Sequence, residues 1–222
     1  RGRVVSGRET IFARVREALA DVPADETPDD TVIRRDYRRD SSLDDAAVVD
    51  LFVENVIDYG ATVHRLSSST DLGETVREIC ERRGVHTMIA APGFPEQVVT
   101  GAGVVLMRDS PPMSPASLDR ADAIITNAAV GIAETGTIVL VSSVGMGRRA
   151  LSLVPDVHLC VVRSDQVVAT VPQAMDVLGP QATRPITFIS GGSATSDIEL
   201  VRVEGVHGPR TLEVIVVSAQ HH

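Results

Sequence analysis

A regular alternation of helix-forming and strand-forming segments constrains the fold of this chain most strongly. The alternation predicts a helix, a strand, a helix and a strand over residues 44–59, 61–67, 72–83 and 85–91. Gly60 and Gly84 end the two helices, and Pro92 ends the second strand. Strands that alternate with helices through short glycine stops form parallel sheets, so we predict an α/β fold with a mostly parallel sheet.

The second half of the chain continues with short strands separated by turns. We predict further strands over residues 103–109, 123–126, 137–141, 157–162, 186–191 and 210–218. Residues 127–131 are predicted to form a turn or a short helix, and residues 171–178 a helix. A further helix is predicted to start near Thr195 or Ser196. Because no repeat or linker interrupts this part, residues 43–222 are predicted to form a single domain.

The apolar composition indicates which residues build the core. Hydrophobic residues make up 43% of the chain, but aromatic residues only 3%, and there is no Trp. The core must therefore consist of Val, Ile, Leu and Ala. Such a core suits parallel strands that are covered on both faces.

The N-terminal segment has a different character. Ser6 and Glu9 have the spacing of a capping box, and apolar residues follow at helical spacing at Ile11, Val15 and Leu19. This pattern predicts a helix over residues 7–20. Residues 21–42 are polar and rich in Pro, Asp and Arg, so we expect residues 1–42 to comprise an N-terminal helix and an extended polar connection.

The charge of the chain argues against several partners. The net charge is -9 and the pI is about 5.1, so the chain lacks the basic surface that nucleic acid requires. No run approaches the roughly 18 apolar residues of a membrane span. Charges interrupt the N-terminal segment too early for a signal peptide. We therefore expect a cytoplasmic protein without a membrane span.

The cysteines and histidines argue against a metal site in this chain. Cys80 and Cys160 lie far apart and belong to no CxxC pair, which argues against zinc, an iron–sulfur cluster or a disulfide. This cysteine usage fits a reducing cytosol. The histidines have no His-x-His or HExxH spacing. We predict no metal and no cofactor in this chain.

A glycine- and arginine-rich loop over residues 142–152 is a first candidate site. Ligands of open parallel sheets bind outside the carboxyl ends of the strands. Glycines let the backbone approach a ligand, and arginine binds carboxylate or phosphate groups. We predict that the ligand-binding residues of this loop are Ser143, Gly145, Gly147, Arg148 and Arg149. The alternative is a flexible surface loop.

A second candidate site follows the predicted strand 186–191. Gly191, Gly192 and Ser193 form a small turn before the predicted helix, which would start near Thr195. Backbone amides at a helix N-terminus bind anions, so we predict that these four residues contact an anionic ligand. The alternative is that the turn only caps the helix.

Glu134 and His158 are candidate catalytic residues. Glu134 precedes Thr135 and Gly136 at the start of a predicted strand, and it is interpreted as a nucleophile, a general base or a turn residue. His158 alternates with apolar residues, so it is either a proton acceptor or a buried core residue.

Four segments of the second half occur in a characteristic order: ADAIITNAAVGIAETGTIVL, GRRALSLVPDVHLCVVRSDQVV, SGGSATSDIEL and GVHGPRTLEVIVV. Together they resemble the LUD-domain family and, within it, the LutC/YkgG branch, the C proteins of lactate utilisation. The resemblance covers roughly residues 43–218. It implies a three-layer α/β fold similar to the NagB/RpiA/CoA-transferase superfamily.

The resemblance also implies a function. The chain would be the cluster-free subunit of a three-component system that oxidises L-lactate to pyruvate. Its partners would be cysteine-rich proteins that carry iron–sulfur clusters. The chain would handle a small anionic substrate or assemble the complex. On the substrate-handling hypothesis, Arg148 or Arg149 with the amides of residues 191–193 hold a carboxylate, Ser143 or Ser193 meets the hydroxyl, and Glu134 or His158 abstracts a proton.

An alternative is an autonomous enzyme of the superfamily that acts on a phosphorylated or CoA-linked substrate. CoA transferases of this fold carry a nucleophilic glutamate in a Glu-Asn-Gly setting. The segment Glu134-Thr135-Gly136 is similar to it, although Thr135 stands at the Asn position. This difference weakens the case for thioester chemistry.

Overall fold

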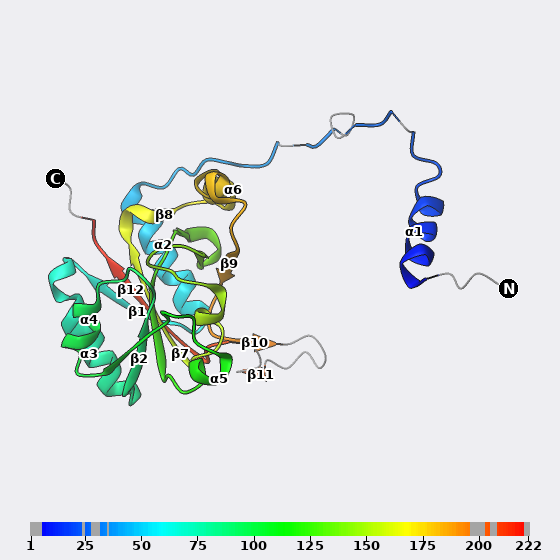
Figure 1. The fold of residues 1–222 in the computed structure, drawn as a ribbon. Coiled ribbons are helices and arrows are strands. Elements are labelled where there is room, and N and C mark those ends of the chain that lie inside the picture. Colours follow the sequence, from blue (N-terminus) through cyan, green and yellow to red (C-terminus); the bar gives the residue numbers. More distant parts are fainter. Residues whose placement is uncertain are drawn as a thin grey trace. The chain divides into compact units, whose positions relative to one another are not determined.

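The computed structural model describes residues 6–23, 25–27, 32–34, 36–195, 203–204 and 208–219 (Figure 1). The chain forms two compact units, residues 1–38 and residues 39–222.

The first unit contains helix α1 (Gly7–Ala18). The capping box at its start is complete. The Glu9 amide donates to Ser6 Oγ at 3.3 Å, and the Ser6 amide donates to Glu9 Oε2 at 2.9 Å. The predicted N-terminal helix is therefore confirmed, although it ends two residues earlier than expected.

The second unit is built on a six-stranded sheet with the order β1-β12-β7-β4-β2-β3. All its strand pairs are parallel, which confirms the predicted α/β fold class. In that order the strands are Thr62–Leu66, Thr211–Val217, Val157–Arg163, Ala123–Asn127, Thr87–Ala90 and Val105–Arg108. Their carboxyl ends lie at one edge of the sheet, and the ligand-binding loops of parallel sheets lie at that edge.

Helices cover both faces of this sheet. Side chains alternate along β12: Val214 and Val216 pack with α2 (Asp45–Asp58) on one face, and Ile215 and Val217 pack with α3 (Leu72–Arg83) and α4 (Glu96–Gly101) on the other. Gly84 ends α3 in the left-handed conformation, as predicted. The short helix α5 (Pro115–Leu118) completes this part of the unit.

A second, four-stranded sheet lies on the other side of α2. Its order is β8-β5-β6-β9, with strands Val167–Val168, Val130–Ile132, Thr137–Val141 and Ile186–Ile189. Ile138 and Leu140 of β6 pack with α2, whereas Val139 and Val141 pack with α6 (Val171–Leu178). Helix α2 therefore shares a core with both sheets.

Two predictions of secondary structure need correction. Residues 127–131 do not form a turn or a short helix throughout, because Val130–Ile132 is strand β5 and pairs with β6. Gly131 allows this packing: a Cβ there would lie 3.0 Å from the Phe52 ring. The predicted helix start at Thr195 is also wrong, because Ala194–Thr195 is strand β10 and pairs with β11 (Val203–Glu204). The other predicted start, Ser196, lies outside the described residues.

Candidate functional site

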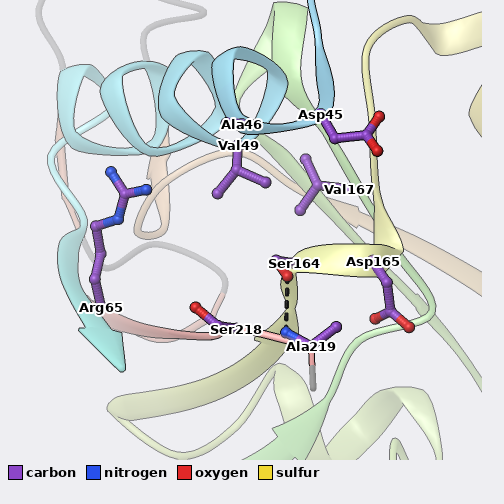
Figure 2. Close-up of a pocket in the computed structure, with 9 residues that line it drawn as sticks. All are labelled: Asp45, Ala46, Val49, Arg65, Ser164, Asp165, Val167, Ser218 and Ala219. Carbon is purple, nitrogen blue, oxygen red and sulfur yellow. Dashed lines mark hydrogen bonds between the residues drawn. The ribbon is translucent and has the colours of Figure 1, made fainter. Parts of the chain in front are cut away.

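A pocket of about 620 Å³ lies at the carboxyl ends of three adjacent parallel strands, β1, β12 and β7 (Figure 2). Arg65 of β1, Ser218 after β12 and Ser164 after β7 line it. Helix α2 forms the opposite wall through its first turns, where Ala46 and Val49 face the pocket. The pocket therefore lies at the edge where ligands of parallel sheets bind.

Hydrogen bonds tie the three strand ends together. The Ser218 amide donates to the Leu66 carbonyl at 2.9 Å, which joins the ends of β12 and β1. The Ala219 amide donates to Ser164 Oγ at 2.9 Å, which joins the ends of β12 and β7. The two serines are thus held on the same side of the pocket, as Figure 2 shows.

The charges and apolar groups of the pocket are separated. Arg65 stands on one side and Asp165 on the other, and Val49 and Val167 point between them (Figure 2). Arg65 Nη1 donates to Asp50 Oδ1 at 2.6 Å. A guanidinium has five N–H donors, so this single contact leaves donors for a second carboxylate.

This arrangement suits a small polar ligand with one anionic end. Arginine binds carboxylates in a planar fork, and serine hydroxyls both donate and accept hydrogen bonds. The apolar wall takes a short aliphatic group. Asp45 also lines the pocket, and a carboxylate of this kind can accept a proton from a hydroxyl group.

The first part of the predicted ligand loop over residues 142–152 lies elsewhere along the same edge, at the ends of β2 and β4. The Gly145 amide donates to the Pro92 carbonyl at 2.7 Å, and the Asn127 amide donates to the Gly145 carbonyl at 2.8 Å. Gly145 has φ +81°, and a Cβ there would lie 2.7 Å from Asn127 Nδ2. Close packing against the sheet therefore explains this glycine without a ligand.

The remaining residues of this loop also have structural partners. Ser143 Oγ donates to the Val141 carbonyl at 3.2 Å, and the Gly147 amide donates to the Ser143 carbonyl at 2.8 Å. A Cβ on Gly147 would lie 2.5 Å from Leu151 Cδ1. The hollow beside the loop measures about 10 Å³, which is about the space of one water molecule.

Arg148 binds a carboxylate of its own chain. Its guanidinium donates to both oxygens of Asp109, at 2.7 and 2.9 Å, and to the Met113 carbonyl at 2.7 Å. These Arg148 hydrogen bonds lower the pKa of Asp109, although burial raises it. The predicted chemistry of Arg148 is therefore present, but its anion is Asp109. The neighbouring Arg149 is exposed.

The second predicted site lies at the opposite edge of the sheet. The Ser193 amide donates to the carbonyl of Pro209, which precedes the start of β12. A Cβ on Gly191 would lie 2.4 Å from the Tyr59 carbonyl oxygen, and a Cβ on Gly192 would lie 2.6 Å from that of Arg210. These glycines therefore allow close backbone contacts. The structure does not bring residues 191–193 together with Arg148, and Thr195 starts no helix.

Glu134 holds the start of helix α6. Its Oε1 accepts a hydrogen bond from the Val171 amide at 2.8 Å, and its own amide donates to the Ala169 carbonyl at 3.1 Å. Gly136 follows with φ +55°, and a Cβ there would lie 2.6 Å from the Asn55 backbone. The Glu-Thr-Gly segment thus joins α6 and α2, which favours the interpretation as a turn.

His158 lies in the core and not in the pocket. It is 1% exposed, and its Nε2 lies 2.9 Å from Thr126 Oγ1. Burial lowers the pKa of His158 to about 4. The neutral ring therefore belongs to the core, which is the structural alternative for this residue.

The sequence does not mark the pocket residues as a site, because the glycine-rich loops that suggest ligand binding lie outside the pocket. Arg65 lies near the end of β1, and Ser164 and Ser218 directly follow β7 and β12. Their position at three carboxyl ends is the signal that finds them, once the order of the strands is known. Among the described residues, no group of three His, Cys, Asp or Glu side chains has the geometry to hold a metal ion. Nor does any helix there have the length and apolar character to cross a membrane.

Known proteins match most of this unit. A family model described as LUD domain matches residues 49–217. Lactate utilization protein C of Deinococcus radiodurans is 48% identical over 184 residues, which cover 82% of this chain and 85% of that protein. Lactate utilization protein C of Bacillus subtilis is 35% identical over 106 residues, which cover 45% of this chain and 44% of that protein.

A solved structure matches the fold. The crystal structure of a DUF162 family protein from Deinococcus radiodurans superposes with a TM-score of 0.65 and 39% identity, and the match covers 79% of this chain and 99% of that chain. Residues 49–217, which the family model matches, include all six strands of the main sheet.

Proposed function

This chain belongs to the LUD domain family, and on that premise we propose that it acts in lactate utilisation as the subunit that binds the small carboxylate substrate. The relatives named lactate utilization protein C support the role in lactate utilisation. The pocket at the ends of β1, β12 and β7 supports the substrate-binding role. The observation that carries the proposal is the placement of one arginine, two serines and an apolar wall around this pocket.

Lactate has three chemical features, and the pocket has a counterpart for each. The Arg65 guanidinium binds the carboxylate, with Asp50 holding it from outside. The Ser164 or Ser218 hydroxyl binds the 2-hydroxyl group. Val49 and Val167 contact the methyl group.

Oxidation of a 2-hydroxy acid to a 2-oxo acid removes two electrons and two protons. In this proposal one of the two carboxylates that line the pocket, Asp45 and Asp165, accepts the hydroxyl proton, and the other accepts the proton that leaves the 2-carbon. The electrons pass to iron–sulfur clusters on cysteine-rich partner subunits.

The cysteines of this chain do not fit cluster ligation, which supports the assignment of clusters to partners. Cys80 and Cys160 are both buried. Burial, with a smaller effect of the Glu81 charge, raises the pKa of Cys80 to about 11. Burial raises the pKa of Cys160 to about 12, against the hydrogen bond from Thr126. Iron–sulfur clusters are usually held by about four cysteines, whereas this chain has two, which pack in separate apolar clusters.

Thermal unfolding of the purified chain with increasing L-lactate or pyruvate tests the substrate-binding role. A ligand that binds only the native state raises the melting temperature as its concentration rises. We expect a rise with the wild-type chain and no rise with Arg65→Ala or with the double variant Ser164→Ala/Ser218→Ala. Arg77→Ala is the matched control, because Arg77 forms exposed ion pairs with Glu74 and Glu81 on α3.

The same assay separates the proposal from its alternative. A rise with ribose phosphate, ATP or a CoA thioester, and none with lactate or pyruvate, would support an autonomous enzyme instead. An equal lactate response in Arg65→Ala and wild type would remove the substrate site from this pocket.

A further inference from the structure

Helix α1 carries an exposed apolar stripe in a unit of its own. None of its residues is buried. With about 100° between successive residues, four apolar side chains fall on one side of the helix. Their exposed fractions are 63% for Ile11, 46% for Phe12, 46% for Val15 and 55% for Leu19. A capped helix with an exposed apolar stripe presents a surface for docking.

The charges of α1 are arranged around this stripe. On a helical projection, Arg14 lies beside one margin of the stripe and Arg16 beside the other. Arg8 and Arg16 place their guanidinium carbons 5.4 and 6.0 Å from the centre of the Phe12 ring. The helix therefore presents apolar side chains framed by arginines, in a chain whose net charge is -9.

A helix with this arrangement fits an apolar groove that carries carboxylates on its rim. A helix bound in a groove is usually anchored by side chains at i, i+3, i+4 and i+7. Phe12, Val15 and Leu19 have the i, i+3, i+7 spacing. Ile11 precedes Val15 by four residues. The flanking arginines would pair with the carboxylates and fix the orientation of the helix.

We infer that α1 is a docking helix for a protein partner that presents an apolar groove with a carboxylate rim. This inference rests on the proposed function, because the iron–sulfur subunits are the partners to which the helix would bind. The 20 residues from 19 to 38 separate α1 from the second unit, and they can span at most about 70 Å.

The width of the stripe favours a protein groove over a membrane surface. Interfacial helices insert a broad apolar face among lipids and carry a strongly cationic polar face. Here the stripe consists of only four side chains. Glu17 lies on the side away from the stripe, and Glu9 lies beside Phe12 and Arg16 at one margin, so the polar face is not strongly cationic. Anionic lipid would also meet a chain whose net charge is negative.

Binding of the full chain to the purified iron–sulfur subunits of the same organism, measured by biolayer interferometry, tests the inference. We expect Val15→Glu to lower the affinity at least tenfold, because it places a charge inside the stripe. Ala13→Glu is the matched control: it adds the same charge on the opposite face, and we expect its affinity to stay within twofold of wild type. Reversing the charge of Arg14 and Arg16 should also weaken binding and reduce its dependence on salt.

Several outcomes would overturn the inference. If wild type and Val15→Glu bind equally, α1 is not the docking element, although the partnership in the proposed function stands. If the wild-type chain binds neither subunit, both the inference and that partnership fail, whereas the lactate response of the pocket is measured independently. If Val15→Glu keeps subunit binding but loses self-association, α1 binds a second copy of this chain. If it keeps subunit binding but loses binding to anionic vesicles, α1 binds a membrane.

Discussion

Arg148 donates two parallel hydrogen bonds to Asp109, from Nε to Oδ2 at 2.7 Å and from Nη2 to Oδ1 at 2.9 Å. The Asp109 side chain is 3% exposed, so this carboxylate depends on Arg148 for its charge compensation. The pair connects the end of β3 to the loop after β6, and it stabilises the carboxyl edge of the main sheet at the end away from the pocket.

Removal of Arg148 should therefore affect stability more than ligand binding. We expect Arg148→Ala to lower the free energy of unfolding by about 2 to 3 kcal/mol, because it leaves a buried carboxylate without its partner. The exposed neighbour Arg149 is the control, and Arg149→Ala should change the free energy of unfolding by less than about 0.5 kcal/mol. Urea unfolding followed by circular dichroism measures both. Equal stability of the two variants would contradict the structural role of the pair.

Glu134 should tolerate replacement by glutamine. Its Oε1 accepts the Val171 amide hydrogen bond, and the glutamine side chain keeps a carbonyl oxygen for this purpose. We expect Glu134→Gln to leave lactate oxidation by the assembled system within about twofold of wild type, and Glu134→Ala to lower stability by about 1 kcal/mol. A nucleophile or general base would behave differently. Loss of the reaction in a stably folded Glu134→Gln protein would restore Glu134 as a catalytic residue.

Because of His158, the free energy of unfolding should fall as the pH becomes mildly acidic. Its pKa is about 4 in the folded protein and about 6.5 in the unfolded chain, so the unfolded state binds the proton first as the pH falls. The stability linked to His158 is complete above pH 6.5 and is lost between pH 6.5 and 4, by about 3 kcal/mol in total. Urea unfolding at several pH values should show a smaller loss over this range in His158→Gln, in which the side chain does not titrate. Identical pH profiles would show that the ring takes up its proton equally in both states.

Glu213 should add a second dependence at lower pH. The Glu213 carboxylate is fully buried and contacts His64, Arg82 and Arg83. Burial alone would raise the pKa of Glu213, but the hydrogen bonds from His64 and Arg83 and the charges of both arginines lower it. The folded state therefore keeps Glu213 ionised at pH values where the unfolded chain takes up a proton. The stability linked to this group is present above about pH 4.5 and is lost as the pH falls through the lower folded pKa.

Glu213→Gln tests this second dependence. We expect the variant to be about 2 kcal/mol less stable at pH 7 and to lose less stability than wild type below pH 4.5. Acid titration of the unfolding free energy measures both effects. A wild-type pH profile in the variant would show that Glu213 is not the titrating group.

Much of the fold follows from local sequence signals. Runs such as the one that forms β12 contain β-branched residues, and a buried parallel strand requires them. Gly84 and the Ser6–Glu9 capping box mark helix ends through the hydrogen bonds that these residues make locally. Strand β5 was not predicted, because Val130–Ile132 is too short to show the alternation of apolar and polar residues that indicates a strand. Its packing depends on contact with Phe52.

The candidate site depends on contacts that no local pattern contains. Arg148 has the residue type of an anion site, but Asp109, 39 residues earlier, decides what it binds. Gly191 and Gly192 look like a ligand loop, but Tyr59 and Arg210 explain why side chains are excluded there. The pocket brings Arg65, Ser164 and Ser218 together only through the strand order β1-β12-β7.

The position of α2 between two sheets has a consequence for motion. Phe52 and Val56 of this helix share one apolar cluster with Leu140 of the small sheet and Val214 of the main sheet. Neither sheet can lose α2 without exposing its core, so the whole unit should unfold cooperatively, and the α2 amides should exchange with deuterium only through global opening. The pocket wall that α2 forms is thus a fixed surface. Ligand entry then depends on side-chain rearrangement at the strand ends and not on a moving helix.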